Sequence, residues 1–174
     1  MLESAENGNT GGSLNSTAGV FRLGDDAANR QYRAILSFNT AALPDNARLQ
    51  SVQLKIRPNG APVGASPFQS LGRLVFDLRS GWFGVNGALA AADFNTTASL
   101  MSAGTFSSSL SAGWYTASLS SSTALGSINR AGVTQLRLRF TKDDNNNRAA
   151  NYMNFFSGNA AAGQPVLVIT YTLP

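Results

Sequence analysis

Two residue types that dominate protein active sites are missing from this sequence of 174 residues, which contains no cysteine and no histidine. The lack of cysteine excludes disulfides, thiolate metal sites and a cysteine nucleophile. The lack of histidine removes the commonest general base, so catalysis would have to use carboxylates or tyrosine. There are nine acidic residues, four of which lie in Asp-Asp pairs. Since no other pair of carboxylates is evident, we predict that the protein is not an enzyme and has no catalytic residue.

Charge is also scarce, at 13% of the residues, and Lys55 and Lys142 are the only lysines. The net charge of +4 is carried mainly by scattered arginines. Because nucleic-acid binding normally needs a concentrated basic stripe, no nucleic-acid partner is expected. A diffuse arginine excess fits an anionic polymer such as a uronate polysaccharide slightly better, although polar outward faces of strands explain it equally well.

Long apolar runs are absent as well, and no stretch approaches the roughly 18 residues of a membrane span. The opening "MLESAENGNTGGS" is polar and acidic and lacks the features of a secretion signal. We therefore interpret residues 1–174 as a single module that was excised from a larger exported protein.

The dominant pattern that is present is alternation of apolar and polar residues with a period of two, which is typical of half-buried strands. "SVQLKIRP" places Val52, Leu54 and Ile56 on one face and Lys55 and Arg57 on the other. "GRLVFDLRS" and "TQLRLRFT" alternate in the same way. "QYRAILSF" and "PVLVITYTLP" are apolar on both faces, as expected of central or doubly covered strands.

"GWYTASL" and "NYMNFFS" are further strand candidates, which brings the expected number to eight or nine. Short helices are expected around "GALAAADF" and within "SSSTALGSINRAG". Turns rich in Gly, Pro and Asn separate the strands. This pattern predicts an all-β fold, an antiparallel two-sheet β-sandwich with a jelly-roll-like strand order.

Two stretches resemble a known family of domains. "RQYRAILSFNTAALPDNARLQSVQLKI" has a strand ending in Ser-Phe, an Asn-Thr-x-x-Leu-Pro turn and a following strand, and "FFSGNAAAGQPVLVITY" has Phe-x-Ser, a small loop and a closing Pro-x-Leu-x-Val strand. Both resemble the DNRLRE family, with Asn39 in place of that family's usual Asp and an unmatched middle third. The resemblance implies a β-sandwich module of a large exported bacterial protein, located extracellularly or on the cell surface, and some members are carbohydrate-binding modules.

The motif Asp-Asp-x-x-Asn-Arg occurs twice, at residues 25–30 and 143–148. Carboxylate and amide oxygens are ligands that calcium prefers, so one calcium ion could be shared if the two loops meet at one end of the fold. The spacing matches no EF-hand loop, and Asp and Asn also stabilise ordinary turns, with Arg30 and Arg148 neutralising the neighbouring carboxylates. Both interpretations stay open, and the candidate calcium ligands are Asp25, Asp26, Asn29, Asp143, Asp144 and Asn147.

Candidate ligand-binding residues are aromatic or cationic. Trp82 and Phe83 lie in a Gly-flanked loop and are candidates for exposed rings that stack on sugars, although a core role is equally consistent. Arg137 and Arg139 share one outward face, and Arg57 belongs to another cationic row. Such rows suit recognition of carboxylates, but arginine also protects strand edges from aggregation.

The sequence therefore favours a non-catalytic extracellular β-sandwich module that binds polysaccharide, with calcium as a possible stabilising ion. The alternative is a structural stalk, fibre or assembly module of a bacterial surface protein, whose sheets contact neighbouring protein modules and bind no sugar.

Overall fold

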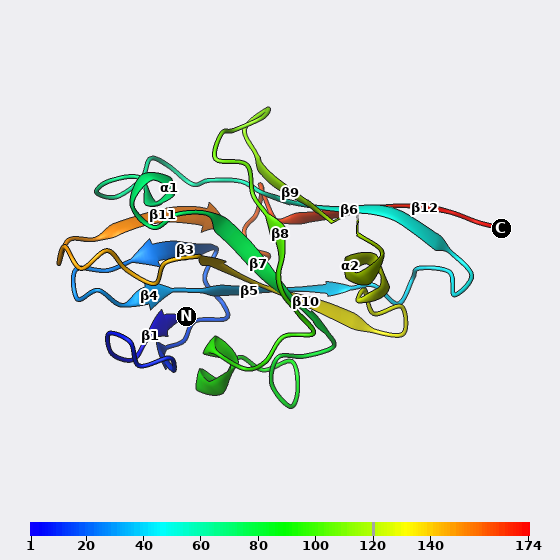
Figure 1. Ribbon diagram of the computed structural model, residues 1–174, viewed down its shortest axis with the longest axis horizontal. Coiled ribbons are helices and arrows are strands. Elements are labelled where there is room, and N and C mark those ends of the chain that lie inside the picture. The colour runs from blue at the N-terminus through cyan, green and yellow to red at the C-terminus, as the bar shows by residue number, and fades with distance from the viewer. Residues whose placement is uncertain (120) are drawn as a thin grey trace.

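The computed structural model describes residues 1–119 and 121–174 and is an all-β protein with three antiparallel sheets (Figure 1). Short helices interrupt the strands at three places: α1 (Pro67–Ser70), the 3-10 helix η1 (Ala91–Phe94) and α2 (Ser122–Gly126). The strands within the described residues are β1 (Leu2–Glu3), β2 (Gly11–Ser13), β3 (Val20–Asp25), β4 (Gln31–Tyr32), β5 (Ala34–Asn39), β6 (Arg48–Ile56), β7 (Leu74–Ser80), β8 (Leu100–Thr105), β9 (Tyr115–Leu119), β10 (Val133–Phe140), β11 (Asn151–Phe156) and β12 (Val166–Thr172).

The strand orders are β11-β3-β4-β1-β2 in the first sheet, β5-β10-β7-β8 in the second and β12-β6-β9 in the third. Most neighbouring strands are distant in the sequence, so the fold depends on long-range pairing. The all-β prediction is confirmed, and the predicted strands at "GWYTASL" and "NYMNFFS" are β9 and β11. The predicted short helices are η1 and α2. The two-residue and three-residue strands of the N-terminal segment were not predicted, because they have no periodic pattern.

Three sheets are present where two were predicted, and Pro58 lies at the break between the first and the third. The segment after β6 pairs with β11 through isolated bridges from Pro58 to Phe155 and from Val63 to Tyr152. Proline has no backbone N–H to donate to a ladder, so continuous pairing stops there. The first and third sheets are thus adjacent but joined only by these single bridges.

The alternation predicted for the longer strands is confirmed on their inner faces. Val52, Leu54 and Ile56 of β6 are buried, while Lys55 is half-buried and Arg57 is exposed. Leu74, Phe76 and Leu78 of β7 are buried, as are Leu136, Leu138 and Phe140 of β10.

The outer faces of β7 and β10 differ from the prediction, since Asp77 and Arg137 are also buried. The reason is that the segment from residue 81 to residue 99 lies over this face of the second sheet. Backbone carbonyls of Asp93 and Thr96 accept hydrogen bonds from the Arg137 guanidinium at 3.0 Å and 2.8 Å. A surface that the sequence predicts to be solvated is therefore an interior contact.

The prediction of a central or doubly covered strand is wrong for "PVLVITYTLP" and holds in "QYRAILSF" only for its first two residues, which form β4 between β3 and β1. β5 and β12 are edge strands of the second and third sheets. Val166 and Val168 of β12 are 41% and 44% exposed, and Tyr171 is 41% exposed. The closing strand thus exposes apolar side chains and has one edge without a neighbouring strand among the described residues. Figure 1 shows β12 leading to the C-terminus on the outside of the fold.

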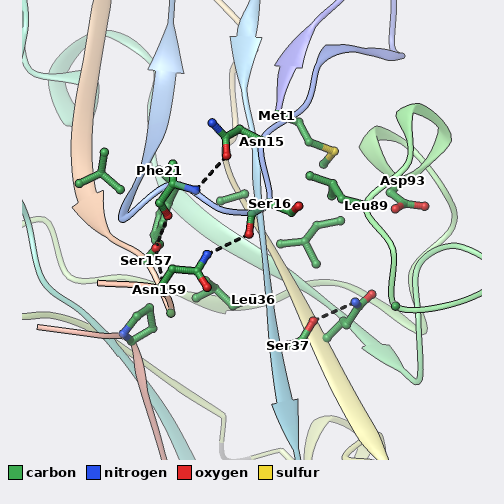
Figure 2. A pocket seen from close by; sticks show the side chains of 18 of the residues that line it. Met1, Asn15, Ser16, Phe21, Leu36, Ser37, Leu89, Asp93, Ser157 and Asn159 are labelled. Carbon is green, nitrogen blue, oxygen red and sulfur yellow. Dashed lines mark hydrogen bonds between the residues drawn. The ribbon is translucent and has the colours of Figure 1, made fainter. Parts of the chain in front are cut away.

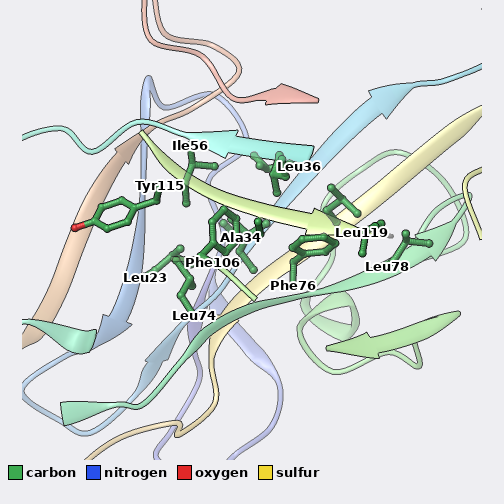
Figure 3. Close-up of a cluster of buried hydrophobic side chains, with 14 of the residues drawn as sticks. Leu23, Ala34, Leu36, Ile56, Leu74, Phe76, Leu78, Phe106, Tyr115 and Leu119 are labelled. Atoms are coloured by element: carbon green, nitrogen blue, oxygen red, sulfur yellow. The ribbon is translucent and has the colours of Figure 1, made fainter. Parts of the chain in front are cut away.

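One hydrophobic cluster takes side chains from all three sheets (Figure 3). Leu23 of β3 and Phe155 of β11 are fully buried in it beside Leu74 and Phe76 of β7. Phe76 packs edge-on against Phe106, with ring centroids 6.0 Å apart. No helix within residues 1–119 and 121–174 has the length and apolar character needed to cross a bilayer.

Candidate functional site

The two Asp-Asp loops lie at the same end of the β3–β11 pair. β3 ends at Asp25, and in the antiparallel register Asp25 faces Asn151, the first residue of β11. The loop after β3 and the loop before β11 must therefore meet. The backbone N–H of Asn151 donates to Asp25 Oδ1 at 3.2 Å, and the N–H of Arg148 donates to Asn29 Oδ1 at 3.1 Å.

The outer member of each pair forms a local turn. Asp26 Oδ1 accepts the N–H groups of Ala28 and Arg30, each at 2.9 Å, and its Oδ2 lies 2.6 Å from the guanidinium of Arg30. This agrees with one of the two interpretations of the motif, in which Asp26 stabilises an ordinary turn and Arg30 neutralises its charge. Asp143 is exposed, and its Oδ1 accepts the N–H of Asp144 at 3.1 Å.

The two asparagines among the predicted ligands stabilise the loops themselves. Asn29 is buried, with its amide oxygen bonded to the loop of residues 143–148 as above and its amide nitrogen 3.4 Å from Glu6 Oε1. Asn147 Oδ1 accepts the N–H of Ala149 at 2.8 Å and the side-chain amide of Asn151 at 3.3 Å. Asp26, Asn29, Asp143 and Asn147 thus each use a side-chain oxygen in a hydrogen bond that stabilises the loops.

Asp25 and Asp144, the other two predicted ligands, are buried carboxylates, at 0% and 7% exposure. Burial raises the pKa of Asp25, against hydrogen bonds from Asn151, and the nearby Asp144 carboxylate raises it further. Burial also raises the pKa of Asp144, and the charges of Asp143 and Glu6 add to this. Within the described residues no three acidic side chains converge as a ready-made metal cluster.

The predicted aromatic site is covered in part. Phe83 is only 2% exposed and its ring lies over the Arg137 guanidinium, 4.5 Å from ring centroid to Cζ. The expectation that Phe83 is exposed is wrong, because its loop folds onto the outer face of the second sheet. Trp82 is half-buried, and its ring lies beside the exposed Gly87.

The predicted arginine row on β10 forms a buried ion cluster instead of an exposed cationic patch. Asp77 of the adjacent strand β7 pairs in register with Arg137, and its Oδ2 lies 2.9 Å from Arg137 and 3.1 Å from Arg139. Arg137 is 1% exposed and the Arg139 side chain is 15% exposed. Arg57, from the other predicted row, is exposed and is not part of this cluster.

The pKa values of Asp77, Arg137 and the neighbouring Arg33 are all lowered, but by different causes. Burial acts to raise the pKa of Asp77, but hydrogen bonds from Arg139, Ser102 and Arg137 outweigh it and hold that pKa below its ordinary value. Burial lowers the pKa of Arg137, against its bonds to Asp77. Arg33 lies nearby, where burial and then the like charges of Arg137 and Arg139 lower its pKa to about 10. Asp77 thus stays ionised at neutral pH and compensates a strongly cationic interior.

The sequence did contain a signal for this cluster. Asp77 is the single acidic residue in the middle of a strand whose neighbours are apolar, and Arg137 and Arg139 are outward residues of another strand. If the pairing of β7 with β10 is known, the ion pair between Asp77 and Arg137 follows from the sequence. The sequence alone does not give that pairing.

A groove of about 480 Å³ runs along the free edge of β5 (Figure 2). All five residues from Ala34 to Phe38 line it, so it follows the edge of the strand and not one face. Figure 2 shows Ser157 and Asn159 on one side of β5 and Leu89 and Asp93 on the other. None of these groove residues was a candidate site residue in the sequence, because the lining comes from several stretches that are far apart in the chain.

The walls of the groove carry polar side chains, and hydrogen bonds connect the segments that form them. Asn159 Nδ2 donates to the carbonyl of Ser16 at 2.9 Å, and the Ser157 hydroxyl donates to the carbonyl of Ala18 at 2.6 Å. Asp93 is buried, and its Oδ2 accepts the N–H of Ala90 at 2.8 Å. Its Oδ1 has no hydrogen-bond partner in the protein. The groove therefore combines amide groups and a hydroxyl with apolar side chains, and the unpartnered oxygen of Asp93 is buried and not exposed in the groove.

No family model and no curated protein matches this chain.

Proposed function

We propose that this protein is a non-catalytic, extracellular β-sandwich module, jelly-roll-like in its organisation, that binds polysaccharide in the groove along β5. The observation that carries the proposal is the groove itself, which is long enough to follow five residues of an edge strand and is walled by side-chain amides and hydroxyls. Sugar hydroxyls exchange hydrogen bonds with amides and hydroxyls, while apolar surface contacts the sugar ring. The resemblance to the DNRLRE family supports the same class of function and an exported, cell-surface location.

A polymer chain suits this groove better than a small ligand does. The peptide groups of β5 that do not pair with β10 lie on the free edge of the strand, and such groups seek hydrogen-bond partners. Phe21 and Phe38 add half-buried rings to the lining. The basic net charge of +4 favours an anionic polymer, and the exposed Arg57 lies near one wall, with its Cδ close to Gly163.

The groove proposal predicts the effect of filling the groove. Gly158 lines it, and a Cβ added at Gly158 meets no heavy atom within 4 Å, so Gly158→Tyr should fold normally and occupy the groove. We expect at least about a tenfold loss of affinity, or about 1.4 kcal/mol. The measurement is calorimetric titration with the polymer that wild-type protein binds on an array of uronate and neutral glycans.

The matched control is Gly126→Tyr. Gly126 is an exposed glycine at the end of α2 that also has open space around its Cβ and does not line the groove. This variant should bind as the wild type does. If no glycan on the array binds, or if both tyrosine variants bind equally well, the groove is not a polysaccharide site.

A second candidate function, assembly with further copies of the chain, is favoured by the exposed edge of β12. Val166, Val168 and Tyr171 expose apolar surface on a strand whose outer edge is unpaired. Unprotected edges of this kind readily pair with another strand. In this role the module would act as a stalk or fibre element of a surface protein.

The assembly candidate predicts reversible self-association that depends on β12. We expect the wild-type protein to form dimers or larger species as its concentration rises, and Val168→Lys to stay monomeric, because a lysine on an edge strand opposes strand pairing. Sedimentation velocity over a range of concentrations measures this. A wild-type protein that remains monomeric at every concentration would exclude assembly through this edge.

A further inference from the structure

Two carboxylates are buried together where the Asp-Asp loops meet. Asp25 is the last residue of β3 and is fully buried, and Asp144 belongs to the loop before β11 and is 7% exposed. The charge of Asp144 acts on Asp25, and the charge of Glu6 acts on Asp144. The loops that carry Asp25 and Asp144 are held against each other by the bonds from Asn151 to Asp25 and from Arg148 to Asn29.

This junction has no positive partner in the described part of the chain, in contrast to the carboxylates of Asp26 and Asp77. Asp26 pairs with Arg30, and Asp77 pairs with Arg137 and Arg139. Among the described residues no salt bridge includes Asp25 or Asp144. Taking an ion out of water without a partner costs several kcal/mol, so buried charges in proteins are normally paired or bind metal.

Hydrogen bonds inside the protein satisfy only part of the Asp25 carboxylate. Asp25 Oδ1 accepts the N–H of Asn151, but Asp25 Oδ2 is buried with no hydrogen-bond partner. Asp144 Oδ1 accepts the N–H of Asn146 at 2.7 Å. An unsatisfied carboxylate oxygen in the interior, next to a second carboxylate, has the chemistry of a ligand that lacks its cation.

We propose that the junction of Asp25 and Asp144 binds a calcium ion that fastens the two loops to each other. The ligands in this proposal are the carboxylate oxygens of Asp25 and Asp144, completed by backbone carbonyls of the adjoining loops and by water. Calcium accepts six to eight such oxygens in irregular geometry, whereas magnesium requires a near-ideal octahedron. Asp26, Asn29, Asp143 and Asn147 are bonded elsewhere and are not ligands in this proposal. The site is separate from the groove and does not depend on the proposed function.

Thermal unfolding of the full chain in calcium and in chelator tests this site. Calcium at about a hundred times its Kd should raise the Tm of the wild type by roughly 5–10 °C, since only the native state holds both loops together. In Asp25→Asn the shift should vanish, and in chelator this variant should be at least as stable as the wild type, because it removes an uncompensated buried charge. Asp25→Asn should therefore be less stable than the wild type in calcium but not in chelator. A purely structural role of Asp25 would make the variant less stable in both.

Two further variants keep the test decisive. Asp144→Asn should also lose the calcium shift, and it carries the test if Asp25→Asn does not fold. Asp143→Asn, one residue away and exposed, should respond to calcium as the wild type does. The proposal is overturned if wild-type Tm is unchanged by calcium, or if Asp25→Asn and Asp144→Asn keep the full shift. Gly158→Tyr should retain the calcium response, so failure of the sugar site and failure of the metal site are distinguishable.

Discussion

Replacing Asp77 with alanine is expected to lower the free energy of unfolding by about 3–5 kcal/mol, the range for removing one partner of a buried ion pair. The carboxylate of Asp77 is fully buried and receives both Arg137 and Arg139. Arg139 can turn toward solvent when its partner is lost, but Arg137 is enclosed by Phe83 and by the carbonyls of residues 93 and 96. The variant would therefore leave a buried guanidinium without a counter-charge. Urea unfolding of both proteins measures the difference.

The pH dependence separates this electrostatic effect from a simple cavity. Because the folded-state pKa of Asp77 lies below its unfolded value, its ionised form contributes stability above about pH 4 and loses it as the pH falls further through the folded pKa. The difference between wild type and Asp77→Ala should accordingly shrink in acid. Asp143→Ala, at an exposed site, should change stability by less than about 0.5 kcal/mol. A difference that stays constant down to acid pH would show that Asp77 contributes by packing and not by charge.

Gly24→Ala is expected to destabilise the protein by at least about 3 kcal/mol, because it combines backbone strain with a clash against main-chain atoms. Gly24 has φ +131°, a conformation that L residues rarely adopt. A Cβ there would lie 2.1 Å from the carbonyl oxygen of Asn151 and 2.6 Å from the Cα of Tyr152. Glycine at this position lets β3 approach β11 closely, directly beside Asp25. Chemical denaturation gives the loss of stability.

A matched substitution provides the control for Gly24. At Gly19 the nearest heavy atom to an added Cβ is 3.9 Å away and the backbone is not in the left-handed region. Gly19→Ala should be neutral or slightly stabilising. Equal effects of the two substitutions would mean that the close approach of β3 and β11 is not what Gly24 provides. Gly24→Ala should also weaken the calcium response, because it displaces the backbone that positions Asp25.

The position of the buried ion cluster bears on where a ligand can bind. The outer face of the second sheet would be the natural place for a sugar platform made of Trp82, Phe83, Arg137 and Arg139. The segment of residues 81–99 occupies that face, and Asp77 neutralises the arginines. The surface that a ligand could reach lies instead at the edge of β5, where the groove is. This is why the groove and not the predicted arginine row is the basis of the proposed function.

The strands and their inner faces could be predicted because they depend on local alternation. Val52, Leu54 and Ile56 are buried as a set because side chains of a strand alternate between its two faces. The edge position of β12 could not be predicted in this way. An apolar strand looks the same in sequence whether it lies at the centre of a sheet or at its edge, since the difference is made by neighbours distant in the chain.

The repeated Asp-Asp motif marked the end of the fold where two loops meet, but not which of its residues face inward. Asp25 and Asp26 are adjacent and chemically identical, yet one is buried beside Asn151 and the other is bonded to Arg30. The sequence by itself determined the all-β class, the inner faces of the long strands and the two acidic loops, because these depend on residue type and short spacing. The tertiary structure alone decided which carboxylates lack a partner, which arginines are covered and where a groove opens, because burial and charge pairing depend on segments far apart in the chain.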